Sequence, residues 1–137
     1  MSYTIRKVRY YHTTVQDQPG EAYRILGTFA DQGVNLLAFS AMPIGPASTQ
    51  LTIFPEDSTA LERLAKKSGM TLIGPYSAFI ISGADEIGAL ARIHERLYRA
   101  KVNVYATNGV TVGDDAYGYI IYIRHEDLER ASAALGV

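Results

Sequence analysis

Two short turns in the sequence each carry an aspartate and, three residues later, a glycine. They read Asp17-Gln18-Pro19-Gly20 and Asp85-Glu86-Ile87-Gly88, and a helical pattern follows each. The start of a helix exposes unpaired amides and the positive end of the helix dipole, which together bind carboxylates. Gly20 and Gly88 have no Cβ, so that a ligand can approach the backbone closely. Either aspartate could pair with a ligand's ammonium group.

An asparagine begins the strand predicted after each helix. Asn35 and Asn103 each offer a donor and an acceptor, and an amino acid needs both. The ligand-binding residues that we predict from these motifs are Asp17, Gln18, Pro19, Gly20, Val34, Asn35, Leu36, Asp85, Glu86, Ile87, Gly88 and Asn103.

A structural role is the alternative for each of these residue types. Aspartate readily caps helices, and for Asp17 and Asp85 we favour the cap over ligand binding. Glycine can serve only to permit a turn, and asparagine can serve only to end a loop. For these two residue types, both roles stay open.

No other residues form a recognisable reactive group. The chain has no cysteine, and its three histidines, at 12, 94 and 125, do not have metal-ligand spacing. Three tyrosines at 117, 119 and 122 lie in a predicted strand, where packing explains them better than a ligand cage does. We therefore expect no catalytic residue, no metal and no cofactor.

The first turn and its helix recur later in the chain. Residues 17–38 and 85–106 align without a gap at a shift of 68 residues, and seven of the 22 positions are identical. Such self-similarity indicates two copies of one unit.

Each copy predicts a small α+β unit. In the first, we expect a strand at 4–15 and then a helix to about residue 30, whose apolar stripe is Ala22, Ile25, Leu26 and Phe29. Two strands at 34–44 and 48–54 and a helix from 57 or 58 to 68 should follow. A short strand at 70–73 should then end at a break at Gly74-Pro75. This order predicts a ferredoxin-like βαββαβ unit, an antiparallel sheet with both helices on one face.

The second copy lacks a fourth strand. It predicts strands at 76–82, 102–112 and 117–123 and helices at 86–100 and 126–135. We divide the chain into repeats at 1–75 and 76–137. Residues 3–7 could complete the second sheet, which we favour, or that sheet could end in an open edge that pairs in a dimer.

Charge and hydropathy argue against nucleic acid and membranes as binding partners. The net charge is -1, which gives no electrostatic attraction to nucleic acid or anionic membranes. We find no signal peptide and no apolar run long enough to span a bilayer, and therefore expect a cytoplasmic location.

Together these motifs resemble the ACT domain. The features are Asp17-Gln18-Pro19-Gly20 after a strand, an amphipathic helix, and Gly33-Val34-Asn35 opening the next strand. The resemblance implies two tandem copies of a non-catalytic regulatory module that binds small ligands, most often amino acids, at interfaces between paired domains. The second copy departs from the pattern with Ile87 in place of proline and Lys101 in place of glycine, which puts equal ligand use by the two copies in doubt.

Three functions follow as hypotheses. The leading one is a regulatory module that binds an amino acid at a seam between units or chains and acts through a homodimer or a regulatory partner protein. The second is an assembly module without a ligand. The third is a small hydrolase resembling acylphosphatase, which would need an arginine-rich anion cradle, and only Arg24 and Arg92 recur.

Overall fold

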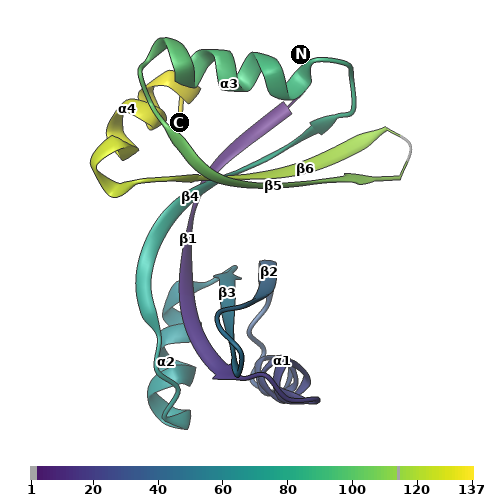
Figure 1. Ribbon diagram of the computed structural model, residues 1–137, viewed down its shortest axis with the longest axis vertical. Helices are drawn as coiled ribbons and strands as arrows, with labels where there is room; N and C mark the ends of the chain where they lie inside the picture. The colour runs from purple at the N-terminus through teal and green to yellow at the C-terminus, as the bar shows by residue number, and fades with distance from the viewer. Residues whose placement is uncertain (1–2, 114) are drawn as a thin grey trace. The chain divides into compact units, whose positions relative to one another are not determined.

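A computed structural model gives the structure of residues 3–113 and 115–137. Residues 1, 2 and 114, which the predicted repeats include, lie outside this part. Figure 1 shows the elements along the chain, and the first six are β1 (Tyr3–Gln16), α1 (Glu21–Asp31), β2 (Leu36–Pro43), β3 (Ser48–Pro55), α2 (Ser58–Ser68) and β4 (Ile73–Ala84). The others are α3 (Ala89–Arg99), β5 (Val104–Val112), β6 (Ala116–Ile123), a 3-10 turn η1 (His125–Asp127) and α4 (Leu128–Leu135).

The chain forms two compact units. The N-terminal unit comprises residues 9–76, and the C-terminal unit comprises residues 3–8 and 77–137. Strands β1 and β4 each run from one unit into the other. In the N-terminal unit β3 lies between β2 and β1, and in the C-terminal unit β6 lies between β4 and β5. Neighbouring strands pair antiparallel in the pairs β1·β3, β2·β3, β4·β6 and β5·β6.

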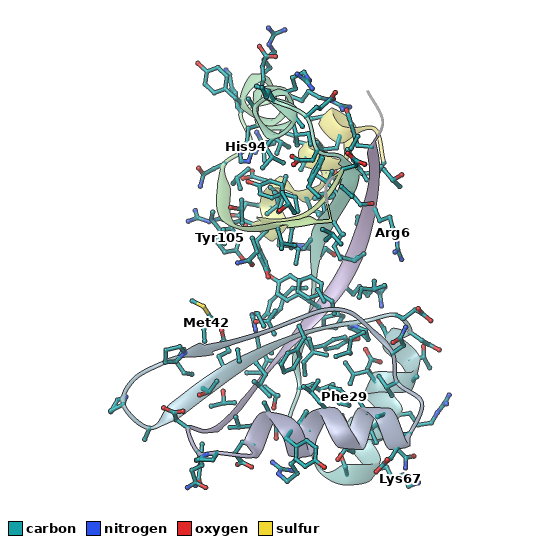
Figure 2. All side chains as sticks on the ribbon, turned by 90° about the vertical axis from the view of Figure 1, so that its right-hand side faces the viewer. Arg6, Phe29, Met42, Lys67, His94 and Tyr105 are labelled. Carbon is teal, nitrogen blue, oxygen red and sulfur yellow. The ribbon has the colours of Figure 1, made fainter. Side chains whose placement is uncertain are left out.

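The core of the N-terminal unit lies between its helices and one face of its strands. Alternation along a strand sends every second side chain to that face. Fully buried members of this core are Tyr11, Phe29, Leu51, Ile53 and Leu61. Phe29 lies on the sheet-facing side of α1 in Figure 2, where the spacing of its apolar residues predicts it. Leu26 of the same predicted stripe is 36% exposed, so that the stripe is narrower than expected.

The core of the C-terminal unit has the same plan. Helices α3 and α4 cover one face of the β4-β6-β5 sheet (Figure 1). Phe79, Ile93, Leu97 and Ile121 are fully buried there, and Tyr3 and Ile5 of β1 pack against the same cluster. Residues at the start of β1 thus contribute to the core of the C-terminal unit.

Two local predictions are wrong. We expected a short strand at 70–73, a break at Gly74-Pro75 and a new strand from 76, but residues 70–72 belong to no strand, and β4 runs without a break from Ile73 through Gly74-Pro75 to Ala84. Proline lacks only its own amide hydrogen, so it interrupts a strand only where that hydrogen bond is needed. The sequence also predicts Pro19 in the first turn of α1, a position that suits proline, but Pro19 lies before the helix, which begins at Glu21.

The backbone repeats with the same shift as the sequence. Strand pairs match at a shift of 68 residues: Leu36 lies opposite Pro55 as Val104 lies opposite Ile123, and an irregularity follows Leu36 and Val104 alike. Loop hydrogen bonds match too, for Val34 N–H donates to Phe29 O at 2.8 Å and Val102 N–H to Leu97 O at 2.9 Å. The two units therefore share one local backbone geometry.

Candidate ligand-binding site

Helices α1 and α3 both begin at a glycine and without a side-chain cap. Gly20 and Gly88 have φ values of 88° and 81°, a left-handed conformation that side chains with a Cβ adopt at a cost. No side chain accepts from the first amides of either helix. By contrast, the Asp57 carboxylate caps α2 and accepts from Thr59 N at 3.0 Å and Ala60 N at 3.3 Å.

The aspartates of the two turns are therefore not caps, and that prediction is wrong. The glycine takes the cap position because the left-handed turn brings the chain into the helix three residues after the aspartate. Each aspartate instead ties its turn to a loop between two strands. Asp17 N donates to Ala47 O at 2.9 Å, and Asp85 N donates to Asp115 O at 2.8 Å.

Backbone donors at both helix starts are consequently open. Within the described residues, the amides of Ala22 and Tyr23 in α1 and of Leu90 and Ala91 in α3 have no hydrogen-bond acceptor. Amides in the first turn of a helix always need a partner from outside the helix, such as a cap, water or a ligand. A bound anion fits this position.

Beside each helix start lies a hollow. The first, of about 360 Å³, includes Asp17, Gln18, Glu21, Ala22, Ala41, Pro43 and Thr49 in its lining. The second, of about 430 Å³, includes Asp85, Glu86, Ala89, Leu90, Gly109, Thr111 and Tyr117. Each of these seven residues lies 68 positions after its counterpart in the first. Both volumes fall within the roughly 300–1,000 Å³ of small-molecule sites.

Negative charge dominates the side chains at both turns. Glu21 pairs with Arg24 Nε at 3.1 Å, and Glu86 pairs with Arg92 Nη2 at 2.8 Å. No side-chain partner of Asp17 or Asp85 is found in the described part of the chain. Each hollow thus combines a free carboxylate with open amides, and these two groups complement an ammonium and a carboxylate.

The two asparagines lie away from these hollows. Asn35 Nδ2 donates to Glu56 Oε2 at 3.1 Å. Asn103 lines a different hollow of about 590 Å³ with His94 and Tyr105. The 11 residues of α3 separate Gly88 from Asn103, and a helix of that length spans about 16 Å. Within one unit, the structure does not bring the glycine turn and the asparagine together.

The remaining predicted residues divide between core and surface. Val34 is buried and Leu36 packs against the N-terminal core. Ile87, in the place of proline in the second turn, is fully exposed at its side chain. Gln18 and Glu86 line the hollows. The sequence motifs therefore locate one wall of each hollow.

The opposite wall of each hollow comes from the strands, and the sequence motifs did not predict it. Thr49 and Tyr117 occupy equivalent positions near the starts of β3 and β6, and Ala41 and Gly109 lie on the neighbouring strands. The 68-residue shift, extended beyond position 106, would have paired these positions but not shown that they face the helix starts. All three predicted packing tyrosines are buried, and Tyr119 Oη also lies 2.7 Å from His94 Nε2.

The described residues contain neither a cluster of metal ligands nor a helix that could span a membrane. No group of three or more histidine, aspartate and glutamate side chains lies close enough to hold a metal ion. No helix in this part of the chain has both the length and the apolar character that a membrane span needs.

Solved structures of similar fold cover nearly the whole chain. A protein from Bacteroides thetaiotaomicron matches 96% of this chain over 88% of its own, with a TM-score of 0.80 and 14% identity. The ligand-free regulatory subunit of aspartate kinase from Thermus thermophilus matches 99% of this chain over 95% of its own, with a TM-score of 0.66 and 17% identity. The corresponding subunit from Thermus flavus gives a TM-score of 0.55 and 16% identity with the same coverage.

The fold is ACT-like. It is an α+β fold of ferredoxin-like units, as predicted from the order of elements. No protein-family model matches the sequence, and no curated protein matches it. At these identities the likeness is one of fold.

Proposed function

We propose that this chain is a non-catalytic regulatory module of the ACT type that binds an amino acid at the starts of α1 and α3. The observation that carries the proposal is the pair of equivalent hollows, each with open helix amides and an unpaired aspartate. The amides complement a carboxylate and the aspartate complements an ammonium group. The fold shared with aspartate kinase regulatory subunits supports a regulatory role.

The module is, in this proposal, a tandem duplication with repeats at 1–75 and 76–137. The matching hydrogen bonds and strand registers at a shift of 68 residues support it. Packing of Tyr3 and Ile5 against the C-terminal core supports residues 3–7 as the fourth strand of the second repeat. That the two glycine turns share a seam stays a prediction, as does a cytoplasmic location.

Regulation would follow from differential binding. A ligand shifts an equilibrium between two arrangements only if its affinity for them differs. The response would then pass to a second copy of the chain or to a partner protein.

Isothermal titration calorimetry against each of the twenty amino acids tests the proposal. At least one should release or absorb heat on binding and should raise the melting temperature, because binding to the folded state stabilises it by about 2.7 kcal/mol at a hundred times Kd. No heat and no shift with any of them would contradict ligand binding.

Matched glycine variants locate the binding. Gly20→Ala and Gly88→Ala add a Cβ at the helix starts, whereas Gly69→Ala adds one at the end of α2, at a similar φ of 76° and away from both hollows. All three should destabilise the protein, but only the first two should weaken binding. Equal binding by all three variants would place the ligand elsewhere.

A second candidate function is assembly without a ligand. Strands β2 and β5 lie at the sheet edges and carry exposed apolar side chains, among them Met42 in Figure 2 and Val110 and Val112. An exposed apolar edge strand favours pairing with another chain. Val110→Lys should then lower the oligomer mass measured by light scattering, and an unchanged mass would argue against pairing through β5.

A further inference from the structure

A tyrosine that lines the hollow of the C-terminal unit has a buried hydroxyl without a partner. Among the described residues, only Tyr117 Oη and Ser132 Oγ are buried side-chain atoms with no hydrogen bond. The Tyr117 residue is 7% exposed and lines the hollow beside α3. Leaving a buried hydroxyl unpaired costs stability, so that such a group in a native protein calls for a reason.

The surroundings of this hydroxyl point toward a ligand. Helix α3 begins without a cap, and the amides of Leu90 and Ala91, which line the same hollow, have no acceptor in the described part of the chain. Three residues that line one hollow therefore each carry a donor that lacks an acceptor. A carboxylate, which has two oxygens and accepts about four hydrogen bonds, matches such a set.

The state of the hydroxyl suits donation. Burial raises the pKa of the Tyr117 hydroxyl above its ordinary value, and the nearby Glu86 and Asp85 carboxylates contribute in the same direction. The phenol therefore keeps its proton at neutral pH and donates a hydrogen bond.

The acidic side chains provide the complementary half. The Glu86 carboxylate already pairs with Arg92, whereas no ion pair of Asp85 is found among the described residues. An ammonium group next to the ligand's carboxylate would pair with Asp85.

The rest of the hollow is less polar than its counterpart in the N-terminal unit. At equivalent positions, Ala89 replaces Glu21 and Leu90 replaces Ala22. Besides Tyr117, the strand side consists of Val110, Thr111 and two glycines, Gly109 and Gly118. Apolar walls favour an apolar ligand side chain, since its burial removes hydrocarbon surface from water.

We propose that Tyr117 is a ligand contact that donates to the carboxylate of an amino acid with an apolar side chain, bound in the C-terminal hollow. The proposal rests on the proposed function and adds to it which hollow takes the ligand, what class of side chain fits, and which hydroxyl selects it. Thr49 occupies the equivalent position in the N-terminal hollow, which has a different lining and therefore a different preference.

The test compares leucine binding by wild type and Tyr117→Phe. Removal of a donor to a charged acceptor should weaken binding about tenfold or more. Without ligand, the variant should melt at the same temperature as wild type or higher, because the unpaired hydroxyl is gone. Ser132→Ala removes the other unpaired hydroxyl, which belongs to a residue that lines neither hollow, and should leave leucine affinity unchanged.

Wild type alone provides a second test that does not depend on the folding of a variant. Leucinamide, which lacks the carboxylate, should bind at least tenfold more weakly than leucine, and aspartate and lysine should bind more weakly than leucine. Equal affinity of Tyr117→Phe and wild type for leucine, equal affinity of wild type for leucine and leucinamide, or tighter binding of aspartate or lysine would overturn this inference while the proposed function stands. The failure of all twenty amino acids to bind wild type would overturn both.

Discussion

The N-terminal and C-terminal units share their backbone but differ in the side chains around it. Equivalent loop hydrogen bonds, strand registers and glycine helix starts recur at a shift of 68 residues. The hollows beside those helix starts nevertheless have different linings, with Glu21 and Thr49 in one and Ala89 and Tyr117 in the other. The comparison teaches that the helix start is common to both units, whereas the selectivity of each hollow is set by the residues around it.

The largest effects should come from the two cores. Phe29 and Leu97 occupy equivalent positions in α1 and α3, and both are buried completely. Phe29→Ala should cost about 3–5 kcal/mol and Leu97→Ala about 2–5 kcal/mol, because each leaves a cavity. Urea unfolding measures both costs. Loss of less than about 1 kcal/mol in either variant would mean that the corresponding core is packed differently from the one described.

The ends of α1 and α3 offer a sharper contrast. Gly33 follows α1 with a φ of 72°, and Lys101 follows α3 with a φ of 60°. The left-handed conformation costs a residue with a Cβ roughly 1–2 kcal/mol. Lys101→Gly should therefore stabilise the protein, and Gly33→Ala should destabilise it, each by about 1 kcal/mol.

The hydrogen bonds that Arg130 makes at the end of α3 do not depend on the Lys101 side chain, so they do not affect the comparison of Lys101→Gly with Gly33→Ala. The Arg130 guanidinium donates to Lys101 O at 3.1 Å and Ala100 O at 3.3 Å, bonds to backbone atoms that Lys101→Gly retains. Thermal unfolding of both variants measures the two effects. If Lys101→Gly lowered stability, the left-handed geometry at the end of α3 would be contradicted.

Replacing Asp57, which caps a helix, should cost more stability than replacing Asp17, which does not. Asp57→Ala removes the cap of α2 and should cost about 1 kcal/mol. Asp17→Ala removes no cap and should change the free energy of unfolding by less than about 0.5 kcal/mol. If urea unfolding showed equal losses of stability in Asp17→Ala and Asp57→Ala, Asp17 would be a helix cap after all, contrary to the structure.

The smallest effect should come from His12, whose equivalent in the second unit is Ile80. Burial lowers the pKa of His12 below its ordinary value, and its Nδ1 lies 3.1 Å from Thr52 Oγ1. Below about pH 6.5 the unfolded chain then binds more protons than the folded protein, so stability falls as pH falls from about 6.5 toward the folded pKa.

A paired measurement isolates the contribution of His12. The urea midpoint of wild type should drop between pH 7.5 and pH 5.5, and His12→Asn should drop less. The other two histidines, at 94 and 125, are common to both proteins and cancel. An identical drop in both proteins would show that His12 does not cause it.

The sequence predicts most of the fold because local signals agree with one another. Spacing of Ile25 and Phe29 gives the buried stripe of α1, and α2 ends at Ser68 as expected. The continuity of β4 through Gly74-Pro75 could not be predicted, because it depends on which backbone groups a neighbouring strand requires. That glycine and not aspartate takes the cap position of α1 and α3 could not be predicted either, because the left-handed turn at the glycine is visible only in the backbone.

The sequence predicts only the helix side of each hollow and not the strand side. The motifs at Asp17 and Asp85 locate the helix side of each hollow. They say nothing of Thr49 and Tyr117, which reach the same hollows from strands that start about 30 residues later. Asn35 and Asn103 follow the helices in sequence and therefore lie at their far ends, where one meets Glu56 and the other a separate hollow.

The most direct test is whether a bound amino acid protects the first-turn amides of α1 and α3 from hydrogen exchange. In amide-resolved hydrogen exchange or NMR with a saturating apolar amino acid such as leucine, the amides of Leu90 and Ala91 should shift and exchange more slowly, and those at the capped start of α2 should not change. Protection confined to Thr59 and Ala60, or no change at any helix start despite measurable binding, would contradict the account.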